Sequence, residues 1–82
     1  MRHRVLAEID AEATSAGDLY GPFTSTHEAY GVLAEEVAEL LEAIRSNSLS
    51  AVRAEAIQVS AVALRLVECC EAGGMFAKRS GA

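Results

Sequence analysis

The sequence has few of the residues that build disulfide frameworks, thiolate metal sites or nucleic-acid interfaces. Its two cysteines are adjacent, at Cys69 and Cys70. Adjacent cysteines provide neither a disulfide framework nor metal-ligand spacing, so a reducing cytoplasm is the expected compartment. The seven basic residues are scattered among twelve acidic ones, and the net charge is -5. Because binding to a phosphate backbone needs clustered lysine and arginine, we expect no nucleic-acid polymer as a partner.

Long apolar runs are also missing. Glu, Arg or Gln interrupts each apolar stretch before it reaches the length needed to span a membrane. The N-terminus is basic at Arg2, His3 and Arg4, but Glu8 and Asp10 follow at once, which is not the pattern of a secretory signal. We therefore expect no membrane partner.

Small aliphatic residues are abundant instead. Hydrophobic residues make up 51% of the chain and aromatic residues only 5%, so alanine, leucine and valine dominate. A chain of 82 residues is one domain with a modest core. Its helix faces should remain partly apolar after folding, and burying them against a second copy predicts a homo-oligomer.

Helical spacing of the apolar residues predicts an all-α fold, a small helical bundle formed by the single domain 1–82. The predicted helices are 2–16, 26–45 and 49–72, followed by a loose tail over 73–82. Gly17 is the expected end of the first helix. Ser25 and Glu28 have the spacing of a capping box, in which each side chain bonds a backbone N–H at the start of the second helix.

The short polar break at 46–48 predicts an antiparallel hairpin of the second and third helices. The second helix has an apolar stripe made of Leu33, Val37, Leu40, Leu41 and Ile44. The middle of the third, 56–67, is apolar on nearly every side, which is typical of a helix surrounded by neighbours.

The hairpin places acidic residues of the two helices at matching heights. Glu39 lies eight residues before Asn47 and Glu55 eight after it, whereas Glu36 and Gln58 lie eleven before and eleven after. Since every residue adds about 1.5 Å to a helix, each pair should lie side by side. Residues three apart share a helix face, so the four side chains should converge.

A cluster of this kind suits a hard divalent cation. Glu55 falls within the apolar stripe of its helix, where an unpaired carboxylate is costly to bury. Oxygen-only ligands fit Mg²⁺, with Mn²⁺ as the second choice. Two simpler interpretations remain open: a solvated acidic surface, or ion pairs of Glu55 with Arg45 or Arg53.

Aromatic and basic residues give further candidates. Tyr20, Phe23, His27 and Tyr30 flank the start of the second helix, where they can form a wall for a flat ring or pack the helix end. Arg53 and Arg65 can contact phosphate, although salt bridges are the commoner use of such residues. The two cysteines are expected to pack in the core, and Met75 and Phe76 against a neighbour.

The motif Glu35-Glu36-Val37-Ala38-Glu39, followed after fifteen residues by Glu55-Ala56-Ile57-Gln58, resembles the EExxE…ExxD signature of the MazG-like, all-α nucleoside triphosphate pyrophosphohydrolases. The wider resemblance, to small phage and bacterial MazG-like proteins, covers roughly residues 5–68. It implies a hydrolase that converts a nucleoside triphosphate into a monophosphate and pyrophosphate. Members assemble as dimers or tetramers, with base pockets often shared between subunits.

The resemblance also assigns roles to individual residues. It implies that Glu36, Glu39 and Glu55 bind Mg²⁺, and that Glu35 is a further ligand or orients the attacking water. The metal would grip the triphosphate and help water attack the α-phosphorus. The substrate-binding candidates are Tyr20, Phe23, His27, Tyr30 and Arg53.

One position departs from the signature. Gln58 stands where the signature has Asp, and an amide oxygen can still ligate Mg²⁺ but brings no charge and cannot act as a base. This leaves two functions open beside the enzyme: a MazG-like scaffold that binds a nucleotide, or only itself, without hydrolysis, and a helical interaction module whose acidic cluster is only surface.

Overall fold

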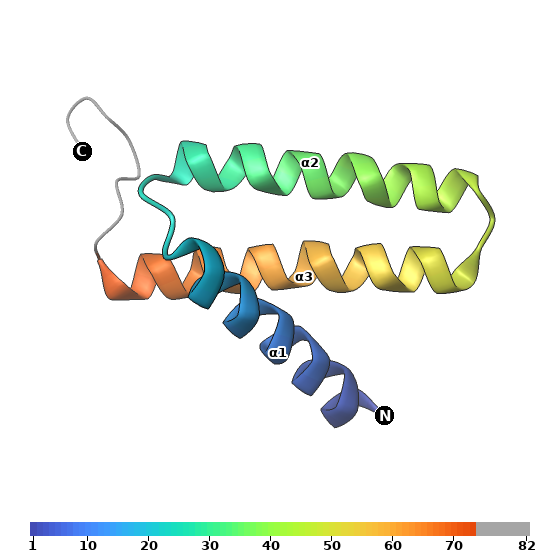
Figure 1. Ribbon diagram of the computed structural model, residues 1–82, viewed down its shortest axis with the longest axis horizontal. Helices are drawn as coiled ribbons and strands as arrows, with labels where there is room; N and C mark the ends of the chain where they lie inside the picture. Colours follow the sequence, from blue (N-terminus) through green and yellow to red (C-terminus); the bar gives the residue numbers. More distant parts are fainter. Residues whose placement is uncertain (74–82) are drawn as a thin grey trace.

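The computed structural model describes residues 1–73, which form three α-helices. These are α1 (Arg2–Tyr20), α2 (Thr26–Arg45) and α3 (Leu49–Ala72) (Figure 1). The predicted all-α class and the order of the helices are confirmed. The predictions for Met75, Phe76 and the tail from residue 74 onward lie outside the described residues.

The first helix is longer than its sequence pattern predicts. It passes through Gly17 and ends at Tyr20, so the predicted end at Gly17 was wrong. A glycine inside a helix costs only about 1 kcal/mol relative to alanine, which the rest of a helix can offset. The residue that caps this end is Gly21, which has a φ of 75° and donates its N–H to the carbonyl of Gly17 at 2.8 Å.

The start of α2 follows the capping prediction with one difference. The Ser25 Oγ accepts a hydrogen bond from the backbone N–H of Glu28 at 3.0 Å, as predicted. The Glu28 carboxylate reaches one residue further back than expected, and its Oε1 accepts from the N–H of Thr24 at 2.9 Å. These bonds fix the end of the α1–α2 loop, residues 21–25, against the first turn of α2.

The predicted hairpin is confirmed. Asn47 lies between α2 and α3 with a φ of 58°, a left-handed conformation that asparagine tolerates better than most residues. Ser48 then caps α3, because its Oγ accepts from the N–H of Ala51 at 3.2 Å. The two helices run antiparallel along their whole length (Figure 1).

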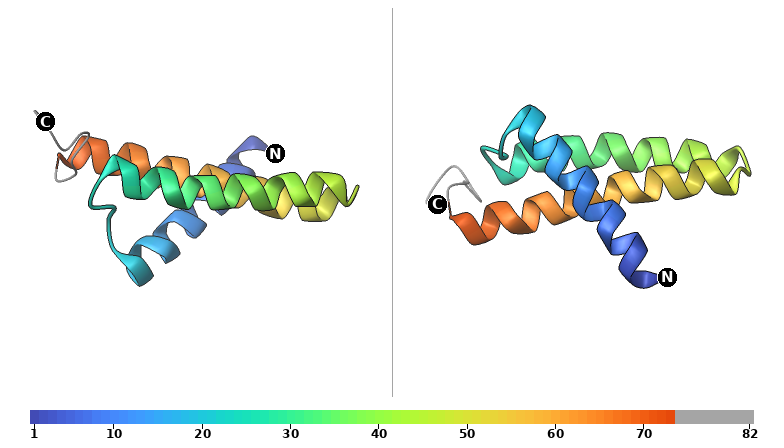
Figure 2. Two further views of the ribbon diagram at one scale, coloured as in Figure 1. Left: turned by 90° about the horizontal axis from the view of Figure 1, so that it is seen from above. Right: turned by 60° about the horizontal axis from the view of Figure 1, so that its bottom comes forward.

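Helix α3 is the centre of the fold. It packs against α2 on one side and is crossed obliquely by α1 on another (Figure 2). Within residues 1–73, α1 and α2 do not pack against each other. This explains why the middle of α3 is apolar nearly all round, since it serves two neighbours.

The core is small and lies near the α1–α2 loop. Phe23, Ala29, Val62 and Cys69 are buried there, and partly buried leucine and valine side chains surround them. Cys69 packs in this core as predicted, whereas Cys70 is exposed. In the part of the chain described, no helix combines the length and the apolar character needed to cross a membrane.

Helix α2 leaves an apolar surface uncovered. Tyr30, Val37, Leu41 and Ile44 lie on one face of the helix and are between 45% and 70% exposed. We call these four residues the α2 stripe. The two other apolar positions predicted for this face, at 33 and 40, are half-buried toward the rest of the fold.

Candidate functional site

Three carboxylates converge between α2 and α3. One oxygen from each of Glu36, Glu39 and Glu55 lies within 4.8 Å of the others, and we call these residues the acidic triad. Glu36 and Glu39 are three residues apart on α2, and Glu55 meets them across the hairpin. Glu36 and Glu55 are half-buried, and Glu39 is exposed. The predicted convergence is therefore present for these three of the four side chains.

The triad can hold a metal ion. Oxygens bound to Mg²⁺ at about 2.1 Å lie roughly 3.0 Å apart when adjacent and roughly 4.2 Å apart when opposite. The spacing in the triad is close to this range, so small side-chain rotations would bring the three oxygens around one ion. Carboxylate oxygens are also the donors that hard divalent cations prefer.

The three carboxylates of the triad repel one another, and a bound cation would reduce this repulsion. The pKa of Glu36 is raised, first by burial and then by the charge of Glu39 and a hydrogen bond with it, with smaller contributions from Glu55 and Glu35. Across residues 1–73, the only ion pair joins Arg53 to Glu8 on α1 at 2.8 Å. No basic side chain therefore neutralises the triad, and the suggested pairing of Glu55 with Arg45 or Arg53 does not occur.

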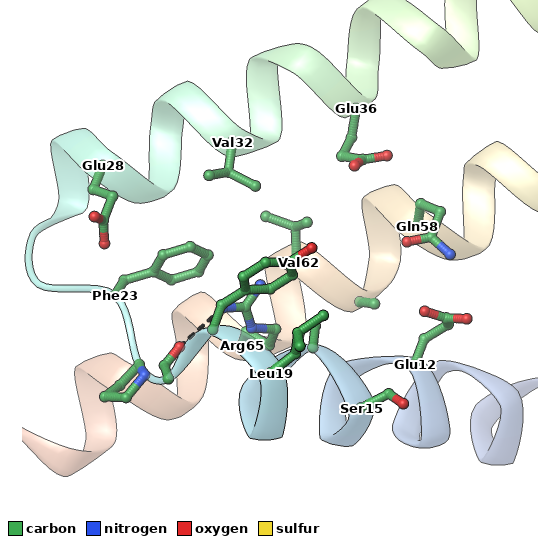
Figure 3. Close-up of a pocket in the computed structure, with 15 residues that line it drawn as sticks. Glu12, Ser15, Leu19, Phe23, Glu28, Val32, Glu36, Gln58, Val62 and Arg65 are labelled. Atoms are coloured by element: carbon green, nitrogen blue, oxygen red, sulfur yellow. Dashed lines mark hydrogen bonds between the residues drawn. The ribbon is translucent and has the colours of Figure 1, made fainter.

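A cavity of about 720 Å³ opens beside the triad. Helix α3 forms its floor, α1 and α2 form its two walls, and the α1–α2 loop closes one end (Figure 3). Glu36 on α2 and Gln58 on α3 face each other at the other end (Figure 3). The volume lies within the range of about 300–1,000 Å³ that small-molecule sites occupy.

The loop end of the cavity is aromatic and cationic. Tyr20 and Phe23 line it, as does Arg65 from the floor. Arg65 is only 8% exposed, and its guanidinium lies 4.3 Å from the centroid of the Phe23 ring. The sequence pattern contained a signal for this position, because Arg65 is three residues from Val62 and four from Cys69, both buried in the core.

Several predicted substrate residues are elsewhere. His27 and Tyr30 are not among the residues that line the cavity, and Tyr30 is exposed on α2. Arg53 points toward α1 and donates a hydrogen bond to the carboxylate of Glu8. This hydrogen bond lowers the pKa of Glu8. Glu35 is exposed and outside the triad, although its charge helps to raise the pKa of Glu36.

The walls of the cavity also contain polar residues that sequence analysis missed. Glu12 and Ser15 on α1 line it, as does the capping residue Glu28 on α2 (Figure 3). Nothing in the spacing of α1 marks Glu12, since its place beside the cavity depends on how the loop turns the chain.

Comparison with known proteins gives no match, whether to a protein-family model, to a curated protein or to a solved structure.

Proposed function

We propose that the chain is a metal-dependent nucleoside triphosphate pyrophosphohydrolase that removes surplus or non-standard nucleotides. One observation carries the proposal: three carboxylate oxygens within 4.8 Å of one another stand beside a cavity of about 720 Å³, and Glu36 belongs to both. A cation-binding cluster next to a cavity of this size is what recognition of a nucleotide triphosphate requires.

The acidic triad would hold Mg²⁺, or Mn²⁺, through its three carboxylates. Such an ion neutralises the charge of the phosphates and lowers the pKa of a bound water. The fit is supported by the donor atoms and their spacing, and by the absence of a basic side chain that would satisfy them within residues 1–73. Gln58 offers an amide oxygen and an N–H₂ group to the phosphates at the same end of the cavity.

The two ends of the cavity suit the two parts of a nucleotide. Phosphates near Glu36 and Gln58 leave the sugar and base to extend toward Tyr20 and Phe23, where an aromatic surface can pack against a flat ring. In the proposed reaction, water attacks the α-phosphorus, and the bond to the bridging oxygen of the β-phosphate breaks to release pyrophosphate. Glu35, which lies outside the triad but whose charge acts on Glu36, would orient the water.

A substrate panel tests the proposal directly. The purified protein is incubated with the common and modified nucleoside triphosphates, with Mg²⁺, with Mn²⁺ or with a chelator, and pyrophosphate is measured. We expect release that depends on the metal. A folded protein that releases none with any nucleotide, and whose melting temperature does not respond to either metal, would overturn both the activity and the metal site.

The second candidate is a MazG-like protein that binds nucleotides without efficient hydrolysis. The observation in its favour is Gln58, an uncharged side chain opposite Glu36. We call this end of the cavity, beside the acidic triad, the metal end. Because the EExxE…ExxD signature has Asp at this position, Gln58 leaves the site with one negative charge fewer than the signature. Nucleotide binding in calorimetry, without pyrophosphate release, would select this function over the first.

The α2 stripe is the surface through which we propose that two copies associate. Tyr30 and Ile44 each lie seven residues from Val37, so an antiparallel copy centred on Val37 would place each Tyr30 against the partner's Ile44. The small residues Gly31 and Ala34 beside the stripe would allow close approach. Sedimentation should show a dimer or tetramer that Val37→Glu dissociates, whereas a monomeric wild-type protein would contradict this assembly.

A further inference from the structure

Arg65 is the only charged side chain that is buried within residues 1–73. No carboxylate lies within 4.0 Å of it, since the one ion pair of these residues joins Arg53 to Glu8. A buried charge without a counter-ion is costly and is kept only where other interactions satisfy it. The position therefore calls for an explanation in terms of what the guanidinium contacts.

Both contacts of the guanidinium are with the α1–α2 loop. Its carbon lies 4.3 Å from the centroid of the Phe23 ring, in the range of a cation–π interaction. Its Nη2 donates a hydrogen bond to the carbonyl oxygen of Gly21 at 3.2 Å (Figure 3). Gly21 caps the end of α1 and is the first residue of the loop, so one side chain of α3 contacts both the start and the middle of the loop.

The same residues line two cavities. The second cavity, of about 400 Å³, is lined by the loop, by α1 and by the last turns of α3. Gly21, Pro22, Phe23 and Arg65 line both cavities. The stacked side chains of Phe23 and Arg65 therefore belong to the wall at the loop end of the larger cavity.

We propose that Arg65 is a positioning residue that latches the α1–α2 loop onto α3 and so shapes the end of the cavity that receives the nucleoside part of the substrate. The substrate part of this inference rests on the proposed function. Arg65 follows Glu55 by ten residues, which puts it about 15 Å along α3 from the acidic triad. A latch at that distance acts on the fit of the nucleoside and leaves the metal end unchanged.

The latch itself is tested by hydrogen exchange, without any substrate. In Arg65→Met, which keeps much of the side-chain volume, the loop amides between Tyr20 and Thr26 should exchange on the order of tenfold faster, because local opening is no longer resisted. The turn amides at 46–48 should be unchanged. Arg45→Met removes an exposed arginine from the end of α2 and is the matched control, which should leave the loop as in the wild type.

Two further variants keep the test decisive if Arg65→Met unfolds. Arg65→Lys keeps a cation but loses the planar group that stacks on Phe23 while bonding Gly21, and should give an intermediate increase in loop exchange. Phe23→Leu removes the ring from the other side of the pair and should also speed exchange. Unchanged loop exchange in the folded variants would overturn the latch.

Kinetics then test the substrate part. Arg65→Met should raise the KM for the nucleoside triphosphate by about tenfold and leave kcat within about twofold, because ground-state and transition-state binding weaken together. The Mg²⁺ concentration that stabilises the protein should not move. A faster-exchanging loop with an unchanged KM would overturn the link to substrate. If the chain hydrolyses no nucleotide, the exchange experiment still decides the latch alone.

Discussion

The two ends of the cavity are built in different ways. The metal end, at which we propose that the acidic triad binds the ion, consists of side chains on two regular helices, whose positions follow from helical repeat and hairpin height. The loop end depends on a turn at Gly21 and on contacts of Phe23 and Arg65, which lie 42 residues apart in the sequence. The first kind of site can be derived from spacing, whereas the second appears only when the chain is folded.

The largest effect is expected from removing a carboxylate of the acidic triad, which tests whether the metal end binds an ion. Glu39→Ala or Glu55→Ala should lower metal-dependent pyrophosphate release by on the order of 100-fold or more, because each removes a charged ligand. The melting shift caused by Mg²⁺ should disappear with it. Glu42→Ala is the control, since Glu42 is exposed on the same helix and outside the triad.

Activity that survives both substitutions would show that the triad is only an acidic surface. In that case the convergence of the carboxylates would have no role in hydrolysis, and the two ends of the cavity would differ only in how they are built.

Adding a negative charge at the metal end should strengthen metal binding, by a smaller factor than the loss of activity expected from removing a triad carboxylate. Gln58→Asp adds a carboxylate opposite Glu36, and the added attraction should tighten Mg²⁺ binding by about tenfold, which corresponds to about 1.4 kcal/mol. Calorimetric titration of the metal measures this. Gln58→Asn, which shortens the side chain equally without adding charge, separates charge from size.

An inactive wild-type protein that gains hydrolysis with Gln58→Asp would establish the binding function as the native one. Metal affinity that is the same in Gln58→Asp and Gln58→Asn would instead place position 58 outside the ligand set.

The smallest expected effect is a pH dependence confined to the metal end. Because the pKa of Glu36 is raised above its ordinary value of 4.5, the folded protein binds this proton more tightly than the unfolded chain. Its contribution to stability is complete below 4.5 and is lost as the pH rises through the raised pKa. In chelator, the wild type should therefore lose melting temperature relative to Glu36→Gln over this interval.

Added Mg²⁺ should reverse the trend, since the ion binds the ionised carboxylates and stabilises the folded state above that interval. Melting curves of the wild type and Glu36→Gln that stay parallel across the interval in chelator would show that Glu36 titrates as a free carboxyl group. The dependence is assigned to the metal end because the three carboxylates meet there.

Much of the fold could be predicted because the helices obey simple rules. The cap at Ser25, the break at 46–48 and the apolar middle of α3 each follow from local sequence. The end of α1 could not, because Gly17 is tolerated inside the helix and Gly21 is where the chain turns with a positive φ. That choice depends on the packing of the loop on α3, which no local pattern records.

In the candidate site too, the features set by spacing along the chain could be predicted, and those set by tertiary packing could not. The convergence of Glu36, Glu39 and Glu55 follows from the matching heights of Glu39 and Glu55 on the hairpin and from the three-residue spacing of Glu36 and Glu39 on α2. The ion-pair partner of Arg53 could not be predicted, because Glu8 belongs to α1, whose crossing of α3 is a tertiary property. The role of Arg65 needed the position of the loop.

Because α1 and α2 do not pack against each other within residues 1–73, each of them is held in place by its packing on α3. A ligand in the larger cavity would contact both helices and would supply the contacts that the bare chain lacks. Docking of α1 and binding of the ligand would then be linked equilibria, in which each increases the other's equilibrium constant by the same factor. A ligand would thus reveal itself in the protection of α1 from hydrogen exchange, even if it never reacted.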